Sequence, residues 1–393
     1  MAVCTFWIAV LLVSYSYVLY PLVLAALVRI RPAPVSSSTK ASATHQAPAV
    51  ACIIAAYNEE RHIAARVENV LTQTYDTEKL TLYVGSDGSR DRTAERLEDK
   101  KGDRVKTFVF DKNRGKASVL NDLVAASTEP ILVFSDANAM FEADAVARLV
   151  DRFRDPAVGA VCGELQLLDA SGTNQDSAYW RIEQFLKLRE AELDGLLGAN
   201  GAIYALRRDC FRPLAPDTII DDFCIAMSAV ADGWRLVYEP AAKAIEDTPD
   251  SIADEYHRRT RIGIGNYQAF FRHPEFFTRT NAATRFTYVS HKVLRWFTPH
   301  LMLVALIASA IAARQSSFYF ALFSLQIAAY GAAAVIWRFN LAAKLPGIVR
   351  MIFMLLTLNW AFLVAFAKFV TGRYSGSWRT TARSFEKSGS TPN

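Results

Sequence analysis

A short apolar run in the middle of the chain, residues 131–135, ends abruptly in two oxygen-bearing side chains. Asp136 and Asn138 follow this run, with Ala137 between them. If the run is a buried strand, the alternation of side chains places Asp136 and Asn138 together at the carboxyl edge of a sheet. Oxygen ligands at such an edge suit Mg²⁺ or Mn²⁺ held against a diphosphate. The sequence therefore predicts a metal site at Asp136 and Asn138.

A second polar cluster follows the apolar run 80–85. Asp87 stands at the end of this run, and the run 50–56 ends similarly at Ala56 and Tyr57. The edge of a uracil offers one N–H donor and carbonyl acceptors, which an aspartate and nearby backbone groups can match. We therefore expect Asp87 and the backbone at Ala56 and Tyr57 to contact a nucleobase.

Positive charge and a general base complete the expected chemistry. Lys116, Arg258 and Arg261 could neutralise a diphosphate together with the metal. Asp222 follows an apolar Ile-Ile pair, and a carboxylate held there is our candidate for accepting the proton of an acceptor hydroxyl.

The elements that must position these residues alternate along the chain. Apolar runs with strand character are each followed by a stretch with helical periodicity, and they occupy residues 50–56, 80–85, 105–110 and 131–136. Four such alternations predict an α/β fold with a mostly parallel, doubly wound sheet, in which every acid-bearing loop lies at the same edge. Further strands are predicted at 158–162 and 235–239, and a long helix at 179–197.

Composition indicates a membrane protein. The 393 residues include 52% hydrophobic residues, with 44 Lys and Arg against 39 Asp and Glu, and the mean hydropathy is +0.12. This is too apolar for a soluble enzyme of such charge content. The net charge of +5 and basic residues beside apolar spans favour a lipid bilayer and argue against nucleic acid. The five cysteines have no C-x-x-C spacing, so neither a zinc site nor a disulfide framework is predicted.

Membrane spans are predicted at both ends of the chain. Residues 2–28 are uncharged, long enough to cross the bilayer, and followed by Arg29 and Arg31, which indicates a retained anchor with cytoplasmic residues after it. Three more spans are expected at 296–313, 318–337 and 348–370. Three such spans would put the basic carboxyl-terminal tail on the outer side of the membrane, against the positive-inside tendency. One of the three segments could therefore be interfacial or re-entrant instead of spanning.

The predicted organisation has five parts. They are a transmembrane anchor (1–31), a linker (32–48), a cytoplasmic catalytic domain (49–284), a membrane region with an interfacial helix and two to three spans (285–372), and a polar tail (373–393).

Several motifs in one order make the resemblance to a family specific. They are Ala56 to Glu59, Ser86 to Asp91, Gly115-Lys116 with Asn121, Asp136 to Asn138, Asn200-Gly201 to Arg208, Asp221-Asp222 and Arg258 to Arg261. Together they resemble glycosyltransferase family 2, and more narrowly its membrane-embedded branch with cellulose, hyaluronan and poly-N-acetylglucosamine synthases. The resemblance covers residues 50–266.

This resemblance implies a nucleotide-diphospho-sugar transferase (GT-A type) fold and an inverting transfer of a hexose from a nucleotide sugar, expected to be a UDP-sugar. Asp222 would be the base, and Asp136 and Asn138 would hold Mg²⁺ or Mn²⁺. The donor site would comprise Ala56, Tyr57, Asn58, Glu59, Asp87, Lys116, Asp136, Arg258 and Arg261. Asn200, Gly201 and Asp221 would lie on the acceptor side. The acceptor would be a growing saccharide, the expected location is the inner membrane of a bacterium, and any export partner is left open.

Three departures from the family pattern bear on these expectations. Asn138 stands where a second aspartate is usual, so the metal site has one charge fewer. Asp221-Asp222 replaces a Glu-Asp pair and keeps the base. The Gln-x-x-Arg-Trp motif of processive synthases appears as 258–262 without its Gln or Trp, which removes an indole that would stack on an acceptor sugar.

Simpler roles compete with some of these assignments. Turns and helix caps commonly contain aspartate and serine, so they could account for Asp87, Ser89 and Asp91. A helix cap could also account for Asp221 and Asp222. The arginines of 258–261 suit lipid headgroups as well as a diphosphate. Two rival functions also stand: a single transfer to a lipid or polyprenyl-phosphate acceptor, and an inactive nucleotide-sugar receptor or scaffold.

Overall fold

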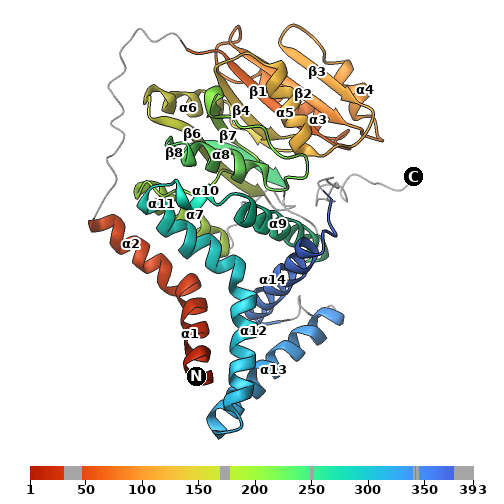
Figure 1. The fold of residues 1–393 in the computed structure, drawn as a ribbon. Helices are drawn as coiled ribbons and strands as arrows, with labels where there is room; N and C mark the ends of the chain where they lie inside the picture. Colours follow the sequence, from red (N-terminus) through yellow and green to blue (C-terminus); the bar gives the residue numbers. More distant parts are fainter. Residues whose placement is uncertain (31–46, 169–177, 248–251, 340, 342–344, 376–393) are drawn as a thin grey trace. The chain divides into compact units, whose positions relative to one another are not determined.

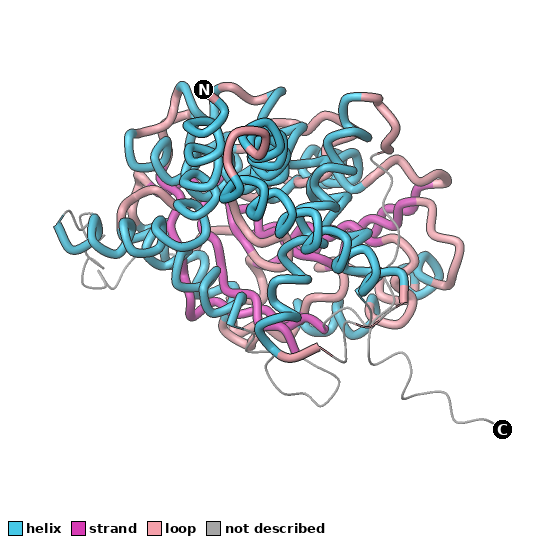
Figure 2. Tube along the Cα trace, turned by 90° about the horizontal axis from the view of Figure 1, so that it is seen from below, coloured by secondary structure: helices cyan, strands magenta, loops and turns pink. Residues whose placement is uncertain are grey.

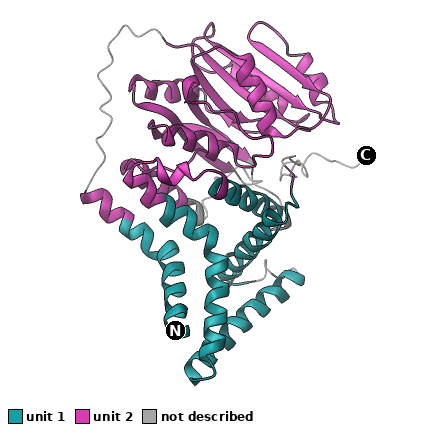
Figure 3. Cartoon of the chain, viewed as in Figure 1, with its two compact units in different colours: residues 1–23, 252–270, 288–374 teal, residues 24–251, 271–287, 375–393 magenta. Residues whose placement is uncertain are grey.

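The computed structural model describes the chain except for residues 31–46, 169–177, 248–251, 340, 342–344 and 376–393 (Figure 1). The predicted linker thus lies outside the described residues up to residue 46, as does the polar tail from residue 376. The chain forms two compact units (Figure 3). Unit 1 comprises residues 1–23, 252–270 and 288–374, and unit 2 comprises 24–251, 271–287 and 375–393. All strands of the described residues belong to unit 2, whereas the described part of unit 1 is helical. Figure 2 distinguishes the strands from the helices by colour.

Unit 2 is built on one mixed eight-stranded sheet in the order β3-β2-β1-β4-β7-β6-β8-β5. Strands β3, β2, β1 and β4 run parallel to one another, as do β6 and β8, whereas β7 pairs antiparallel with β4 and β6, and β5 with β8. The predicted α/β fold is confirmed, with antiparallel pairs confined to the second half of the sheet. The strands are β1 (Val50–Ala56), β2 (Leu80–Asp87), β3 (Val105–Phe110), β4 (Ile131–Asp136), β5 (Met140–Phe141), β6 (Val158–Leu168), β7 (Tyr204–Arg207) and β8 (Arg235–Asp247).

Strand β1 is the centre of the hydrophobic core. All seven of its residues are buried, and alternate side chains enter two different apolar clusters. Cys52 and Ile54 belong to the cluster with Val67 and Val70 of one helix, whereas Ile53 belongs to the cluster with buried residues of helices on the other face. An uninterrupted apolar strand is what burial on both faces of a sheet requires.

Helices cover both faces of this sheet. One cluster takes apolar residues from α3 (Ile63–Leu71) and α6 (Ala145–Asp151), and the other takes them from α5 (Lys116–Ala126) and α8 (Asp221–Ala231). Further α-helices of unit 2 are α4 (Thr93–Glu98), α7 (Ala178–Glu192), α10 (Glu275–Thr278) and α11 (Ala282–Thr287).

The register of the strands brings the polar loops to one edge. Ala55 of β1 pairs with Gly85 of β2 and with Asp136 of β4, so the carboxyl ends of three parallel strands coincide. Strand β7 runs the other way, with Tyr204 opposite Phe134. The residues just before β7 therefore return to the edge at which Asp136 stands.

Unit 1 contains most of the apolar helices. Four helices among the described residues are long and apolar enough to cross a membrane: Ala2–Ile30, Ala282–Ala312, Ser317–Arg338 and Val349–Val370. They include α1 (Ala2–Ser14), α2 (Tyr20–Ile30), α12 (Leu294–Ala312), α13 (Ser317–Arg338) and α14 (Gly347–Val370). Phe6 and Ala9 of α1 pack against Ala305 and Ala308 of α12. At the start of the predicted membrane region (285–372), the chain continues directly into α12 through π-helical turns at Tyr288–Val293.

Helix α9 (Ile252–Arg272) departs from the predicted domain limits. Its residues 252–270 belong to unit 1, although the sequence places them within the catalytic domain. Close packing explains this: a Cβ on Gly263 would lie 2.8 Å from the Ala365 Cβ of α14. Tyr267 of α9 is fully buried and donates its hydroxyl to the Trp296 carbonyl at 2.7 Å.

Candidate active site

Asp87, at the end of β2, shapes the loop that begins α5. Its carboxylate accepts hydrogen bonds from the backbone N–H groups of Arg114 (2.8 Å) and Gly115 (2.9 Å). Gly115 has φ +91°, a conformation that favours glycine, and the helix begins at the next residue, Lys116. Asp87 has no exposed surface. The structure thus gives it a loop-forming role, and its contact with a nucleobase stays a prediction.

Lys116 joins two carboxylates from different elements. Its Nζ atom lies 2.8 Å from Asp136 Oδ1 at the end of β4 and 3.0 Å from Asp221 Oδ2 at the start of α8. The side chains of Lys116 and Asp221 are largely buried, with 12% and 7% of their surface exposed, whereas Asp136 is 29% exposed. The ammonium group therefore fixes the end of β4 against α8 and leaves Asp136 accessible.

Gly201 marks the point at which the predicted site residues meet. A Cβ atom on Gly201 would lie 3.2 Å from Asp136 Oδ2, 3.4 Å from Asp222 Oδ2 and 3.7 Å from Lys116 Nζ. Residues far apart in the sequence thus converge beside a glycine, whose missing side chain leaves space between the two carboxylates. The expected convergence of Asp136 and Asp222 is what the structure shows.

Burial and neighbouring charge shift the titration of this cluster. Burial and the adjacent Asp221 raise the pKa of Asp222 to about 6, although Lys116 acts in the opposite direction. Burial alone would lower the pKa of Lys116, but Asp136 and Asp221 outweigh it and raise that pKa above its usual value. At neutral pH the lysine is therefore charged, and Asp222 is close to the point at which it exchanges a proton.

The loop after β1 is tied to the loop after β2. Asn58, which has φ +54°, donates its backbone N–H to Ser89 Oγ at 3.1 Å and accepts the Arg90 N–H on Oδ1 at 2.8 Å. Glu59 donates its N–H to Thr93 Oγ1 at 2.8 Å. Tyr57 is half-buried and Ala56 is buried beside this loop. The predicted donor residues 56–59 thus lie at the same edge as Asp87, and their contact with a donor stays a prediction.

The residues present fit a divalent cation bound together with a phosphorylated ligand. Three carboxylates, of Asp136, Asp221 and Asp222, surround one ammonium group, which leaves a negative site. Among the described residues no three His, Cys, Asp or Glu side chains form a complete metal-binding group. Magnesium is commonly held by one or two carboxylates plus substrate phosphates, and Asp136 could supply such a carboxylate. Asn138 donates its amide to Glu246 at 3.0 Å, which leaves its oxygen as the second predicted ligand.

Arg66 of α3 is a site residue that sequence reasoning missed. It is fully buried and donates through Nη2 to Ser135 Oγ at 2.8 Å, while Ser135 donates to the Ala202 carbonyl at 2.7 Å. The residue before Asp136 is thus joined to the residue after Gly201. Burial lowers the pKa of Arg66 to about 10, a value at which it still carries its charge at neutral pH. Its signal was present in the sequence: with Ile63, Val67 and Val70 it occupies the core-facing positions of a helix.

Comparison with known proteins identifies the family of this domain. Residues 51–213 match the family model described as Glycosyl transferase family 2. The chain carries a domain of glycosyltransferase family 2. Two relatives named poly-β-1,6-N-acetyl-D-glucosamine synthase match it, at 28% identity in Staphylococcus aureus (56% of this chain, 55% of the relative) and 25% in Staphylococcus epidermidis (62% and 61%). The chain thus spans little more than half the length of the curated relatives it matches.

A solved structure shares the fold of this family 2 domain and its flanking helices. The mannosyltransferase of Pyrobaculum calidifontis, solved in complex with GDP-Man and Mn²⁺, superposes with a TM-score of 0.72 at 20% identity over 94% of this chain and 100% of that chain. The GT-A type fold that the sequence predicts is thereby confirmed.

Two predicted site residues of the family 2 pattern lie outside unit 2, which we call the catalytic unit because it carries the carboxylate cluster. Arg258 and Arg261 are in the part of α9 that belongs to unit 1. Their expected contact with the diphosphate of a donor therefore stays a prediction.

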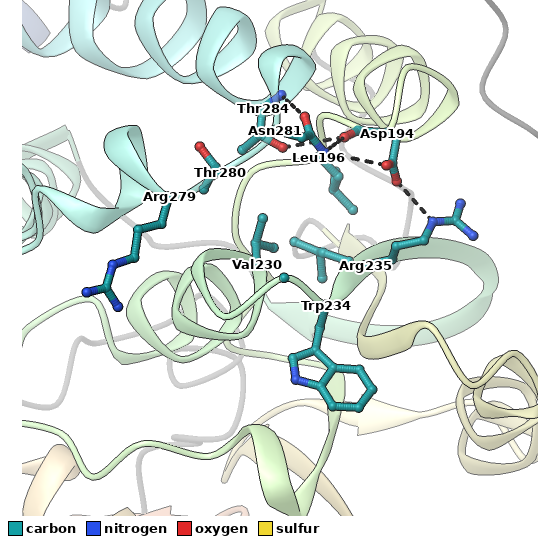
Figure 4. A pocket seen from close by; sticks show the side chains of 11 residues that line it. Asp194, Leu196, Val230, Trp234, Arg235, Arg279, Thr280, Asn281 and Thr284 are labelled. Atoms are coloured by element: carbon teal, nitrogen blue, oxygen red, sulfur yellow. Dashed lines mark hydrogen bonds and ion pairs between the residues drawn. The ribbon is translucent and has the colours of Figure 1, made fainter.

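A separate cavity of about 380 Å³ lies in the catalytic unit (Figure 4). Its lining shares no residue with the carboxylate cluster. Asp194, which has φ +59°, accepts the Arg235 guanidinium at 3.1 Å, and its carbonyl accepts the Asn281 amide at 3.1 Å. Leu196 and Val230 line the apolar part between these groups. The polar contacts at this cavity attach α11 to the segment after α7, which is a structural role.

Proposed function

We propose that this protein is an inverting membrane-bound glycosyltransferase. It would transfer a hexose from a nucleotide sugar, with UDP-sugars as the expected class, to a growing poly- or oligosaccharide. The observation that carries this proposal is the convergence of Asp136, Asp222 and Lys116 beside Gly201 in a family 2 domain. The names of the relatives, which are synthases of an N-acetylglucosamine polymer, support the saccharide acceptor.

Asp222 would act as the general base. The acceptor hydroxyl attacks the anomeric carbon from the face opposite the diphosphate, so a new C–O bond forms as the bond to the phosphate oxygen breaks. The electron pair of the broken bond leaves with the nucleoside diphosphate, and the hydroxyl proton passes to the Asp222 carboxylate. Its raised pKa, about 6, makes it a stronger base than an ordinary aspartate and leaves it mostly ionised at neutral pH.

Lys116 and Asp136 would serve the leaving group. The ammonium of Lys116 is held in place by Asp136 and Asp221 before any ligand arrives, so its positive charge needs little reorganisation to face a diphosphate. Asp136, with the Asn138 amide oxygen, would hold Mg²⁺ or Mn²⁺. The cation supplies the additional positive charge that a departing diphosphate needs.

The membrane setting is part of this proposal. The four membrane-capable helices support an integral membrane protein, and we place it in the inner membrane of a bacterium with the catalytic unit facing the cytoplasm. Nucleotide sugars in that compartment would then reach Lys116 and Asp136 directly.

The test uses the full chain in nanodiscs with a panel of nucleotide sugars. Release of nucleoside diphosphate is measured with chelator and after addition of Mg²⁺ or Mn²⁺. Asp222→Asn should lower transfer by about 100-fold or more, while donor binding persists. Asp232→Asn is the matched control, because Asp232 lies at the other end of α8 and pairs with Arg212. Undiminished transfer by Asp222→Asn would remove Asp222 as the base.

A single transfer to a lipid or polyprenyl-phosphate acceptor is the second candidate. It is favoured by Ile262, which stands where processive synthases of this resemblance carry Trp. A radiolabelled donor separates the two functions, since a processive enzyme gives a ladder of polymer and a single transfer gives one lipid-soluble product.

A further inference from the structure

The polar face of α7 reaches the loop that carries Gly201. Lys187 of α7 donates from Nζ to Asn200 Oδ1 at 2.8 Å, and Asn200 donates its amide to the Gly163 carbonyl at 3.0 Å. Asn200 is the residue before Gly201, beside which Asp136 and Asp222 meet. Lys187 is thus bonded to the residue that precedes Gly201, in the segment that leads into β7.

A buried acid accompanies this lysine. Glu164 of β6 is only 6% exposed, and Gln184 of α7 donates its amide to the Glu164 carboxylate. Burial raises the pKa of Glu164, and the positive charge of Lys187 opposes that shift. Lys187 also lies 5.5 Å from the centre of the Tyr238 ring of β8.

We infer that Lys187, Asn200 and Glu164 form the acceptor subsite and that its ligand is a neutral, hydroxyl-rich saccharide. This inference rests on the proposed function and names the acceptor of the same site. An ammonium group has three donors and a carboxylate about four acceptor positions, so each keeps capacity beyond the contacts described above. Sugar hydroxyls both donate and accept, which suits a lysine, an amide and an acid placed together.

The charge of the subsite selects between acceptor classes. The positive charge of Lys187 is matched by the negative charge of Glu164, so the pair offers hydrogen bonds without net charge. The attraction of Lys187 for a phosphate at the end of a polyprenyl chain would be offset by repulsion from Glu164. The subsite therefore favours the saccharide acceptor over the phosphorylated lipid.

The test separates transfer to the acceptor from transfer to water. The full chain in nanodiscs receives a nucleotide sugar with or without a neutral oligosaccharide, and both nucleotide release and glycosidic product are measured. Lys187→Met should lower transfer to the oligosaccharide by about tenfold or more, because a charge-assisted hydrogen bond is lost. Donor hydrolysis without acceptor should fall far less than transfer does, and Lys187→Arg should recover part of the transfer. Arg189→Met is the control, since Arg189 lies on the same helix and pairs with Glu192.

The variant Glu164→Gln distinguishes the two acceptor classes, because its effect on transfer should have opposite signs for them. Removing this acid should raise the KM for a neutral oligosaccharide, whereas it would improve transfer to polyprenyl phosphate by removing a repulsion. An unchanged KM for the neutral oligosaccharide in Glu164→Gln would therefore overturn the inference. So would an equal loss of hydrolysis and transfer in Lys187→Met, because a lysine that only braces the Gly201 loop affects both. A wild-type protein that releases no nucleotide from any donor would instead reject the proposed function, and this inference with it.

Discussion

Asn138 donates its side-chain amide to Glu246 Oε1 at 3.0 Å and so joins the loop after β4 to the end of β8. The contact needs a neutral amide, because an aspartate at position 138 would place a second carboxylate against Glu246. With its nitrogen directed at Glu246, the amide presents its oxygen elsewhere. Glu246 thus fixes which way the amide of Asn138 faces.

Glu246→Gln should weaken Mn²⁺ binding by about tenfold or more, since partners that orient metal ligands contribute this much. The pair should behave as a unit, so Asn138→Asp combined with Glu246→Gln should recover most of the affinity. Mn²⁺ binding is followed by electron paramagnetic resonance in the presence of nucleoside diphosphate, with no need for turnover. Glu142→Gln is the control, because Glu142 pairs with Lys243 at 3.6 Å and has no contact with Asn138 among those described. Equal affinity in Glu246→Gln and the wild type would show that Glu246 has no role at the metal.

The contrast between Asp136 and Glu246 shows what the sequence could reveal. Asp136 ends an apolar run, so strand periodicity alone predicts its position at the sheet edge. The burial of all seven residues of β1 is equally predictable, because a continuous apolar strand needs cover on both faces of the sheet. Glu246 has no such local signal, since its importance depends on a partner more than a hundred residues away.

The same limit applies to other residues and to the division into units. Lys187 lies on a helix of mixed charge, and only the fold brings it to Asn200. Helical periodicity predicts that Arg66 faces the core, but its buried partner Ser135 lies 69 residues away in the sequence and is revealed only by the fold. The assignment of 252–270 to unit 1 follows from the close packing of Gly263 on α14, a contact between distant segments.

The pH dependence of transfer should report Asp222. With a pKa raised to about 6, the base is protonated below this pH and inactive, so the rate should fall about tenfold per pH unit there and level off above. A cation beside Asp136 adds positive charge and shifts the midpoint to lower pH. The rate of transfer is therefore measured from pH 4.5 to 8 at two Mg²⁺ concentrations. An acid limb that is missing, or a midpoint above pH 7, would exclude this assignment.

The raised pKa also fixes the sign of a stability effect. A carboxyl whose pKa is higher in the folded state than in the unfolded chain, where it is about 3.9, disfavours folding as pH rises from about 4 through about 6. Asp222→Asn should therefore raise the unfolding temperature of the catalytic unit at pH 7.5, and the gain should disappear below pH 4. Thermal unfolding in nanodiscs is followed by tryptophan fluorescence. A loss of stability at pH 7.5 would contradict the environment described for Asp222.

Gly201→Ala should slow transfer without harming the fold. The added methyl group would lie 3.2 Å from Asp136 Oδ2 and 3.4 Å from Asp222 Oδ2, in the space between the two carboxylates. Its backbone does not have the positive φ that would make alanine strained. We expect transfer to fall by about tenfold or more, because small displacements of reacting groups are costly, with an unchanged unfolding temperature. Gly102→Ala is the matched control, as a Cβ there would meet nothing within 4 Å.

Ser135→Ala tests whether Arg66 positions the site. The serine hydroxyl accepts from Arg66 and donates to the Ala202 carbonyl, so its removal leaves two buried groups without this partner. The expected cost is about 1–3 kcal/mol of unfolding free energy. If the bridge also holds the Gly201 loop against Asp136, kcat should fall while the KM for the donor changes little. Ser118→Ala is the control, since that hydroxyl is exposed and bonds within its own helix turn. A variant that loses stability but keeps its full kcat would limit Arg66 and Ser135 to a role in folding.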